Sequence, residues 1–271
     1  MVKVSLTIKS STMKEEVKIF FTALMFYTRI PGPKNLGHKP EYINKATRYF
    51  PLIGWIVGGL SFLAFWASTL VFDTSISVVF SLITGVLVTG AFHEDGLADV
   101  FDGFGGGWTK EKILKIMKDS QIGAFGAIAL VFLFLLKFAV LNSLMAQPDQ
   151  VLVTLLFFIS YHSLARLTAI NIVFISQYSR DDATSKVKPI AKTHGITEIF
   201  GAYFSGLLPL AGLCWFHWQF ALVLIPLFLL CLLSKRYFEK WIDGYTGDCL
   251  GAVEQMGECV AVLGYLVVLG M

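Results

Sequence analysis

Seven apolar stretches account for most of the 271-residue chain and constrain its fold more than any other feature. Most are close to the roughly 20 residues that an α-helix needs to cross the hydrocarbon core of a bilayer. Backbone polar groups find no water inside a bilayer, so such segments form helices. The sequence therefore predicts an all-α, polytopic membrane helical bundle. The expected spans are residues 50–72, 76–92, 122–145, 151–175, 198–216, 219–234 and 249–271.

The composition agrees with a membrane bundle and narrows the range of partners. The chain is 55% hydrophobic and 15% charged, and its 24 glycines permit close packing between helices in a bilayer. The net charge of +3 is small and no basic run is present, so we expect no nucleic-acid partner. The four cysteines lack metal-binding spacing. We expect one integral membrane domain over residues 1–271, with the lipid bilayer as its partner.

Two short segments complete the predicted topology. The apolar stretch Ile19–Ile30 is too short to span and ends at Pro31, so it is interpreted as an interfacial or re-entrant helix after a polar N-terminus. The spans 198–216 and 219–234 are separated only by His217 and Trp218, which requires a tight hairpin.

Lysine and arginine are confined to the segment before the first span and to alternate connections after it, with Lys137 and Arg166 as the exceptions. By the positive-inside rule, the N-terminus and all the basic connections are cytoplasmic. The longer connections, which have room for chemistry, therefore face the cytosol. The basic segments are 1–49, 93–121, 176–197 and 235–248.

An acidic stretch follows the second span and leads into glycines at 103 and 105–107. Asp95, Asp99 and Asp102 have i, i+4, i+7 spacing, which places them on one face of a helix, whereas Glu94 points about 100° away. Like charges on one face destabilise a helix unless they are neutralised, and Mg²⁺ with oxygen ligands is the usual solution. The alternative is a solvated acidic helix end without a ligand.

Charged residues within the spans need partners. Arg166 lies roughly 13 Å of helix from the cytoplasmic end of its span, and we expect it to pair with an acidic side chain or a substrate phosphate. Glu254 and Glu258 share one face of the last span, so they face the bundle interior, a cation or a cationic partner. Lys137 lies nearer the outer end and is predicted to snorkel to the membrane surface.

Further acids and basic groups are predicted to border the acidic stretch. Asp119 ends an amphipathic segment, 110–118, and Asp248 lies at the membrane boundary between glycines. The basic connection 176–197 is interpreted either as a phosphate-binding lid or as a solvated loop that sets topology. Carboxylates that hold a divalent metal, with lysines and arginines around them, suit phosphoryl transfer.

Five motifs along the chain resemble those of one family. They are FYTRIP from Phe26, RYFPLIG from Arg48, HEDGLAD from His93, IMKDSQIG from Ile116 and TGDCLGA from Thr246. Together they are similar to the cobalamin synthase family, the adenosylcobinamide-GDP ribazoletransferases of the late vitamin B12 pathway.

The resemblance implies an enzyme of the bacterial inner membrane, with its active site facing the cytosol, that depends on Mg²⁺. Its substrates would be adenosylcobinamide-GDP and α-ribazole or α-ribazole 5′-phosphate. GMP would leave, and adenosylcobalamin or its 5′-phosphate would form. The oligomeric state stays open, with a homo-oligomer among the alternatives.

The roles expected for individual residues combine this resemblance with the spacing above. Four acids are expected to be catalytic and to hold Mg²⁺ and the diphosphate, with one of them acting as a base. Two more acids would complete the metal site, and four basic residues would bind phosphate oxygens. The four acids are Glu94, Asp95, Asp99 and Asp102, the two further acids are Asp119 and Asp248, and the basic residues are Arg29, Arg48, Lys118 and Arg166.

Two other functions remain as alternatives. The run from Asp99 to Gly103 fits the first half of the CDP-alcohol phosphotransferase pattern, D-x-x-D-G-x-x-A-R…G-x-x-x-D-x-x-x-D. However, no A-R follows it, and Asp119 has no acidic partner four residues on. An ion-coupled transporter lined by the charged residues of the spans is the second alternative, although most carboxylates lie at the cytosolic boundary.

Overall fold

The computed structural model describes residues 4–33, 40–146, 150–179 and 194–270. Their regular structure is helical, apart from a single bridge between Tyr178 and Tyr245. The helices are α1 (Val4–Tyr27), α2 (Pro40–Ala46), η1 (Thr47–Tyr49), α3 (Phe50–Ser68), α4 (Thr74–Thr89), α5 (Phe92–Gly106), α6 (Lys110–Ile116), α7 (Ala124–Met145), α8 (Val151–Ile175), α9 (Ile196–Phe216), η2 (Trp218–Val223), α10 (Leu224–Ile242) and α11 (Gly247–Leu269). The prediction of an all-α bundle is confirmed.

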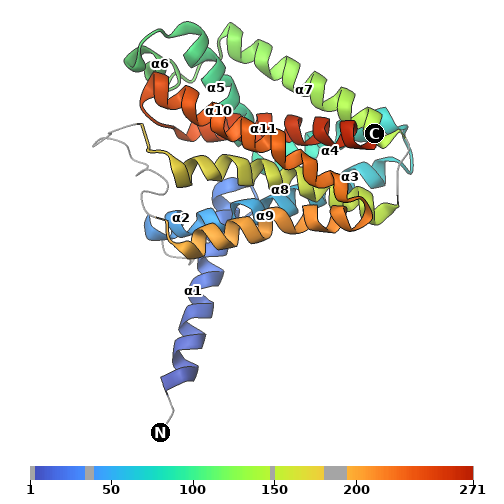
Figure 1. The fold of residues 1–271 in the computed structure, drawn as a ribbon, viewed down its shortest axis with the longest axis horizontal. Coiled ribbons are helices and arrows are strands. Elements are labelled where there is room, and N and C mark those ends of the chain that lie inside the picture. Colours follow the sequence, from blue (N-terminus) through green and yellow to red (C-terminus); the bar gives the residue numbers. More distant parts are fainter. Residues whose placement is uncertain (1–3, 34–39, 147–149, 180–193, 271) are drawn as a thin grey trace.

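Six helical segments are long and apolar enough to cross a membrane, and a seventh span results if α4 and α5 count as one. Each of the predicted spans overlaps one of these helices. The sixth is longer than predicted, because Trp218–Ile242 continues past residue 234. The chain is a multi-pass membrane protein (Figure 1).

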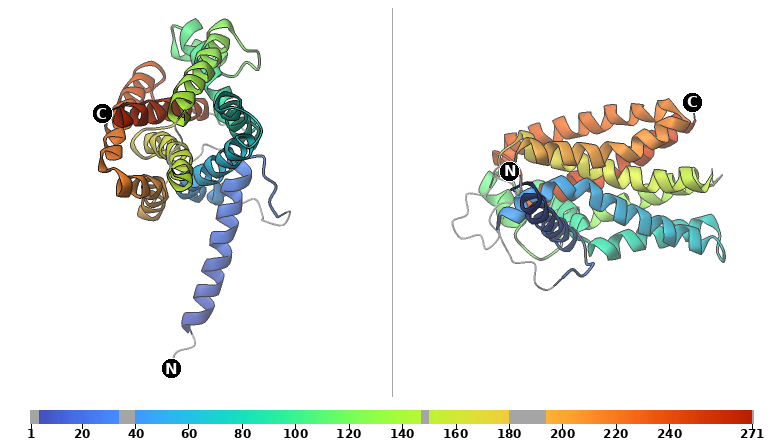
Figure 2. Two further views of the ribbon diagram at one scale, coloured as in Figure 1. Left: turned by 90° about the vertical axis from the view of Figure 1, so that its right-hand side faces the viewer. Right: turned by 90° about the horizontal axis from the view of Figure 1, so that it is seen from below.

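The most buried helix, α8, packs against both α3 and α11 (Figure 2). Gly54 and Gly58 of α3 make the first contact close, since a β-carbon on either would lie within 2.8 Å of the α8 backbone. On the other side, a β-carbon on Gly257 of α11 would lie 3.1 Å from the Cα of Ala165. Small residues at i, i+4 spacing are the usual means of bringing membrane helices together. This packing places the polar side chains of α8 in the interior.

The second predicted span is broken. Helix α4 ends at Thr89, and α5 leaves it at an angle of 88°. Gly90 and Ala91 both have left-handed backbone conformations, with φ of 70° and 58°. The predicted span over 76–92 therefore corresponds to α4, which ends three residues earlier, and the bend into a second helix was not predicted. The acidic stretch is the second arm of a bent helix pair.

Helix α1 differs from the predicted short helix over 19–30. It runs continuously over Val4–Tyr27 and stands out from the bundle, across the direction of the other helices (Figures 1 and 2). Beyond its end, the backbone N–H of Arg29 donates to the carbonyl oxygen of Val88, 2.7 Å away. A β-carbon on Gly90 would lie 2.2 Å from Nε of Arg29. The segment after α1 is therefore docked on the α4–α5 break.

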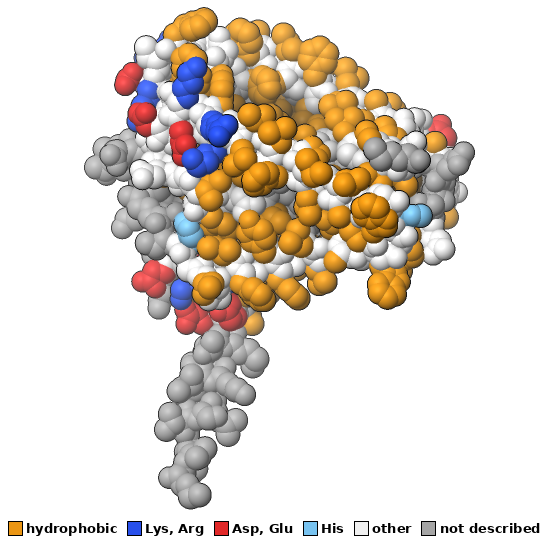
Figure 3. All heavy atoms as spheres, viewed as in Figure 1, with side chains coloured by type: hydrophobic (Ala, Val, Ile, Leu, Met, Phe, Trp, Pro, Cys, Tyr) orange, Lys and Arg blue, Asp and Glu red, His pale blue; other side chains and the backbone are white. Residues whose placement is uncertain are grey.

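Charged side chains gather at one end of the bundle, where α5, α6 and the first turn of α11 lie; we call this the charged end. Figure 3 shows them there, whereas apolar side chains cover the flank of the bundle in that view. Exposed apolar residues of α9 and α10 include Phe200, Trp215 and Phe228. An apolar flank with charges gathered at the bundle end is the distribution expected of a protein in a bilayer.

Candidate functional site

The acidic helix α5 presents two of its aspartates at the surface of the charged end. Asp95 is exposed and Asp99 is partly exposed. The predicted helix is present, so Asp95, Asp99 and Asp102 lie along one face.

Asp102 has a different environment from the other two. Its Oδ2 accepts from the backbone N–H of Gly123 at 2.7 Å, and its Oδ1 accepts from that of Gly126 at 2.9 Å. The carboxylate therefore caps the N-terminus of α7, where anions are favoured. A β-carbon on either glycine would lie 2.4 Å from an Asp102 oxygen. Because both oxygens are engaged and the residue is only 9% exposed, this geometry indicates a structural role.

The start of α11 lies against α5. A β-carbon on Gly96 would be 2.9 Å from the carbonyl oxygen of Asp248, and one on Gly251 would be 3.0 Å from that of His93. The hydroxyl of Thr246 caps α11 and donates to Oδ2 of Asp248 at 3.2 Å. The close approach at Gly96 brings Asp248, which is partly exposed, to the helix that carries Asp95 and Asp99.

Tyr245 lies just before this turn and is buried. Burial, and then the phenol of Tyr178, raise the pKa of Tyr245 above its ordinary value. The backbone of Tyr245 also bonds to Gln177 and Ser179. A neutral, immobile tyrosine therefore holds the connection between α10 and α11.

Lys118 and Asp119, which were predicted to bind phosphate and metal, lie between α6 and α7. Oδ1 of Asp119 accepts from the backbone N–H of Gln121 at 3.1 Å, which shapes the turn. Asp119 and Lys118 are both exposed at the charged end. Either is accessible to a substrate.

Glu94 points into the bundle. It is 7% exposed, and its Oε1 accepts from Nε2 of Gln255 on α11 at 3.2 Å. Its Oε2 has no hydrogen-bond partner among the described residues, and Glu94 is one of the residues that line a cavity of about 20 Å³. Such a volume holds about one water molecule, so a substrate diphosphate has no room at this carboxylate.

The predicted phosphate-binding arginines occupy three different settings. Arg29 is exposed beside the α4–α5 break. Arg48 is 9% exposed and forms ion pairs with Glu16 at 3.2 Å and Glu198 at 3.4 Å. Its charge is therefore already paired with two carboxylates, one on α1 and one on α9.

Arg166 is 1% exposed, and its guanidinium lies 2.7 Å from Oε1 of Glu254 and 3.5 Å from Oε1 of Glu258. It also donates to the carbonyl oxygen of His162 at 2.9 Å. The expectation that it pairs with an acidic side chain is met, but these ion pairs leave no place for a phosphate. Glu254 and Glu258 face the interior and a cationic partner, as predicted.

Lys137 is buried with Arg166, Glu254 and Glu258, and we call this group and its direct neighbours the interior cluster. The prediction that Lys137 snorkels to the membrane surface was therefore wrong. Its ammonium group donates to Oε2 of Glu258 at 2.6 Å and to Oε1 of Gln255 at 2.5 Å. With two acceptors inside the bundle, the side chain gains nothing by reaching the membrane surface.

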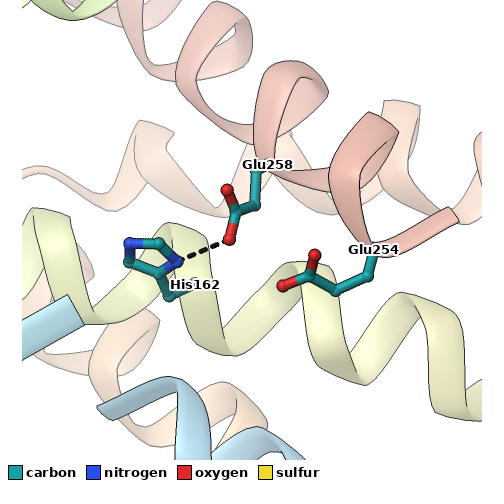
Figure 4. A group of neighbouring side chains, drawn as sticks. All are labelled: His162, Glu254 and Glu258. Carbon is teal, nitrogen blue, oxygen red and sulfur yellow. Dashed lines mark hydrogen bonds and ion pairs between the residues drawn. The ribbon is translucent and has the colours of Figure 1, made fainter. Parts of the chain in front are cut away.

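His162, Glu254 and Glu258 bring ligand atoms within 4.8 Å of one another, which is metal-like geometry. Figure 4 shows Glu258 of α11 hydrogen-bonded to His162 of α8, with Glu254 one turn along the same helix face. However, Arg166 and Lys137 already neutralise the two carboxylates. A divalent cation would have to displace buried ion pairs, so we interpret the cluster as structural.

Sequence reasoning missed three members of this interior cluster: His93, His162 and Gln255. A signal existed for His162, which lies four residues before Arg166 on the same helix face. Gln255 offered none, because two of its three partners, Glu94 and Lys137, lie on the distant helices α5 and α7.

Comparison with known proteins identifies the family. The profile of the cobalamin-5-phosphate synthase family matches residues 19–266. A protein named adenosylcobinamide-GDP ribazoletransferase from Shewanella frigidimarina is 44% identical over 94% of this chain and 95% of its own length. Another with that name, from Shewanella oneidensis, is 44% identical over 95% of this chain and 97% of its own. No solved structure matches. The chain therefore belongs to the cobalamin-5-phosphate synthase family.

Proposed function

We propose that this chain is an adenosylcobinamide-GDP ribazoletransferase, the activity stated in the names of its relatives. A ribose hydroxyl of α-ribazole or α-ribazole 5′-phosphate forms a new P–O bond to the cobinamide-side phosphorus. The P–O bond to the GMP group breaks, and GMP leaves with the bridging oxygen. The hydroxyl proton passes to a base, and adenosylcobalamin or its 5′-phosphate is released. The close approach of α5 and α11 at Gly96 carries the proposed site, since it brings the backbone of Asp248 against the helix that bears Asp95 and Asp99.

Mg²⁺ is proposed as the cofactor because the accessible donors are carboxylate oxygens, its preferred protein ligands. Asp95, Asp99 and Asp248 would hold it, and the exposed Asp119 of the α6–α7 turn is a further candidate ligand. When bound, the ion would neutralise diphosphate charge. Glu94 and Asp102 are left out of this set, because their carboxylates are buried against Gln255 and against the α7 backbone.

The remaining roles fall to exposed groups of the charged end. Arg29 and Lys118 are accessible and would bind phosphate oxygens. Either Asp95 or Asp99 would accept the proton of the attacking hydroxyl. Asp95 is the more exposed of the two, so it is better placed to pass that proton to water.

The proposed location is the bacterial inner membrane, with the charged end toward the cytosol. The connection between α5 and α7, which contains α6, lies at this end and is basic, whereas the segments 69–73 and 146–150 contain neither lysine nor arginine. The positive-inside rule then sets the orientation. Both water-soluble substrates would reach the site from the cytosol.

The proposal is tested with protein purified into liposomes, with adenosylcobinamide-GDP, α-ribazole 5′-phosphate and Mg²⁺, by following GMP and corrinoid product. We expect metal-dependent product that EDTA abolishes, and a loss of about 100-fold or more in Asp99→Asn. Glu111→Gln is the matched control, because Glu111 is an exposed acid of the same end, on α6.

Each outcome has a separate meaning. Folded protein that releases no GMP but transfers a group from CDP-activated lipids would replace the proposed reaction by CDP-alcohol phosphotransfer. Product formation that Asp99→Asn leaves unchanged would retain the reaction and reject the acidic site.

A further inference from the structure

Gln255 of α11 lies in the interior cluster and is hydrogen-bonded to three of its neighbours. Its Oε1 accepts from the ammonium group of Lys137 on α7 at 2.5 Å. Its Nε2 donates to Oε1 of Glu94 on α5 at 3.2 Å, and to Oε2 of Glu254 at 2.9 Å. One side-chain amide on α11 thus joins a cation on one helix to carboxylates on α5 and on α11 itself.

Chemistry allows only one orientation of this amide. Turned the other way, its NH₂ group would face the ammonium of Lys137 and its oxygen would face two carboxylates. Lys137 has no acceptor function, and ionised carboxylates have no donor function. Lys137 therefore directs the NH₂ group of Gln255 toward Glu94.

The neighbouring residues of each helix also approach each other, although neither ring nitrogen of His93 has a hydrogen-bond partner among the described residues. Oε2 of Glu254 lies 3.5 Å from Nδ1 of His93, and Glu254 is itself paired with Arg166 of α8. The His93 ring also contacts the rings of Phe50 and Phe92, with centroids 5.7 and 5.3 Å away. Of these two successive residues of α5, only Glu94 is therefore held to α11 by a side-chain hydrogen bond.

The same turn of α5 carries the proposed catalytic acids on its outer side. Asp95 follows Glu94 directly, and Asp99 is one turn further along the face of Asp95. The start of α5 has no cap from its own sequence, since Ala91 offers no side-chain acceptor and no donor. Contacts with the neighbouring helices, including the Glu94–Gln255 hydrogen bond, therefore hold this first turn in place.

We propose that Gln255 is a positioning residue of the transferase reaction, and that it holds the first turn of α5 through Glu94. This rests on the proposed function. Glu94 then acts by accepting one hydrogen bond and neither binds metal nor removes a proton. The water-sized cavity that Glu94 lines together with Lys137 and Arg166 agrees with that role.

The test compares variants that keep the 94–255 hydrogen bond with variants that remove it. Glu94→Gln keeps an oxygen that accepts from Gln255, and we expect a kcat within about threefold of wild type. Glu94→Met and Gln255→Met remove the bond, and we expect each to lower kcat at saturating substrate about tenfold or more. The double variant should lose no more than the worse single one, because both changes break the same contact.

Ser160→Ala is the matched control. It removes the buried hydrogen bond of 2.6 Å between Ser160 of α8 and Tyr265 of α11, which touches no residue of α5. Hydrogen exchange followed by mass spectrometry gives a readout that needs no turnover. Exchange over residues 92–99 should rise in Gln255→Met and stay at the wild-type level in Ser160→Ala.

Two results would overturn the proposal. One is a Glu94→Gln variant that is folded yet as inactive as Glu94→Met, since the carboxylate itself would then be needed. The other is multiplicative loss in the double variant. An inactive wild type with these substrates refutes the proposed function instead, and the exchange pattern over α5 then decides whether Gln255 holds the helix.

Discussion

The carboxylate of Asp102 accepts a hydrogen bond from the backbone N–H of Gly123, at 2.7 Å, where α7 begins. With the second bond, from Gly126, one side chain of α5 satisfies two of the backbone donors that every helix leaves unpaired at its start. The acid that sequence spacing assigned to metal thus has a role in joining two helices.

Removing this cap should destabilise the protein. We expect Asp102→Ala to lower the free energy of unfolding by about 2–4 kcal/mol, because it leaves two N–H groups without their charged acceptor. Unfolding in mixed detergent micelles measures the change. Wild-type stability combined with a loss of metal activation would show instead that Asp102 is a ligand.

Breaking the ion pair of Arg166 should lower the free energy of unfolding by more than the loss of the Asp102 cap does. Arg166→Met leaves Glu254 buried with its charge uncompensated, and loss of one partner of a buried pair typically costs about 3–5 kcal/mol. We expect poor yield and a large loss of stability. A stable variant with a raised KM for adenosylcobinamide-GDP would contradict this, since it would place Arg166 at a phosphate.

The contact at Gly96 should be sensitive to a single methyl group. In Gly96→Ala the new β-carbon would meet the backbone of Asp248, so α5 and α11 must move apart. Displacements of about 1 Å at a reacting centre can cost on the order of 100-fold in rate. We expect a loss of kcat of that order in a folded protein. Gly59→Ala is the control, because nothing lies within 4 Å of its added carbon; equal losses in both would refute the idea.

The left-handed conformation of Ala91 should be relieved by glycine. A residue with a β-carbon at φ of 58° is strained by about 1–2 kcal/mol, part of which glycine loses again through its freer unfolded chain. We therefore expect Ala91→Gly to stabilise the protein by up to about 1 kcal/mol. In contrast, Ala139→Gly, at an exposed position in the interior of helix α7, should destabilise it by about 1 kcal/mol. Measurements of the free energy of unfolding of both variants show whether the first is stabilised and the second destabilised.

The sequence predicted some features of this structure and not others, for physical reasons. Hydropathy identifies spans because the bilayer imposes a length, and the cost of burial showed that Arg166, Glu254 and Glu258 need interior partners. Which charges pair depends on how α8 and α11 pack, and no local pattern contains that. The 88° break at Gly90–Ala91 was missed because apolar side chains continue through it. The central part of the basic connection 176–197 lies outside the described residues.

The ion pairs of the interior also impose an order on biosynthesis. Lys137 and Arg166 are translated well before Glu254 and Glu258. Each lies in a span, where a lone charge costs about 2.5–3.5 kcal/mol on insertion. The nascent chain must therefore carry both cations without these glutamate partners until its last helix arrives. Only when α11 packs against α5, α7 and α8 do Lys137 and Arg166 gain Glu258 and Glu254.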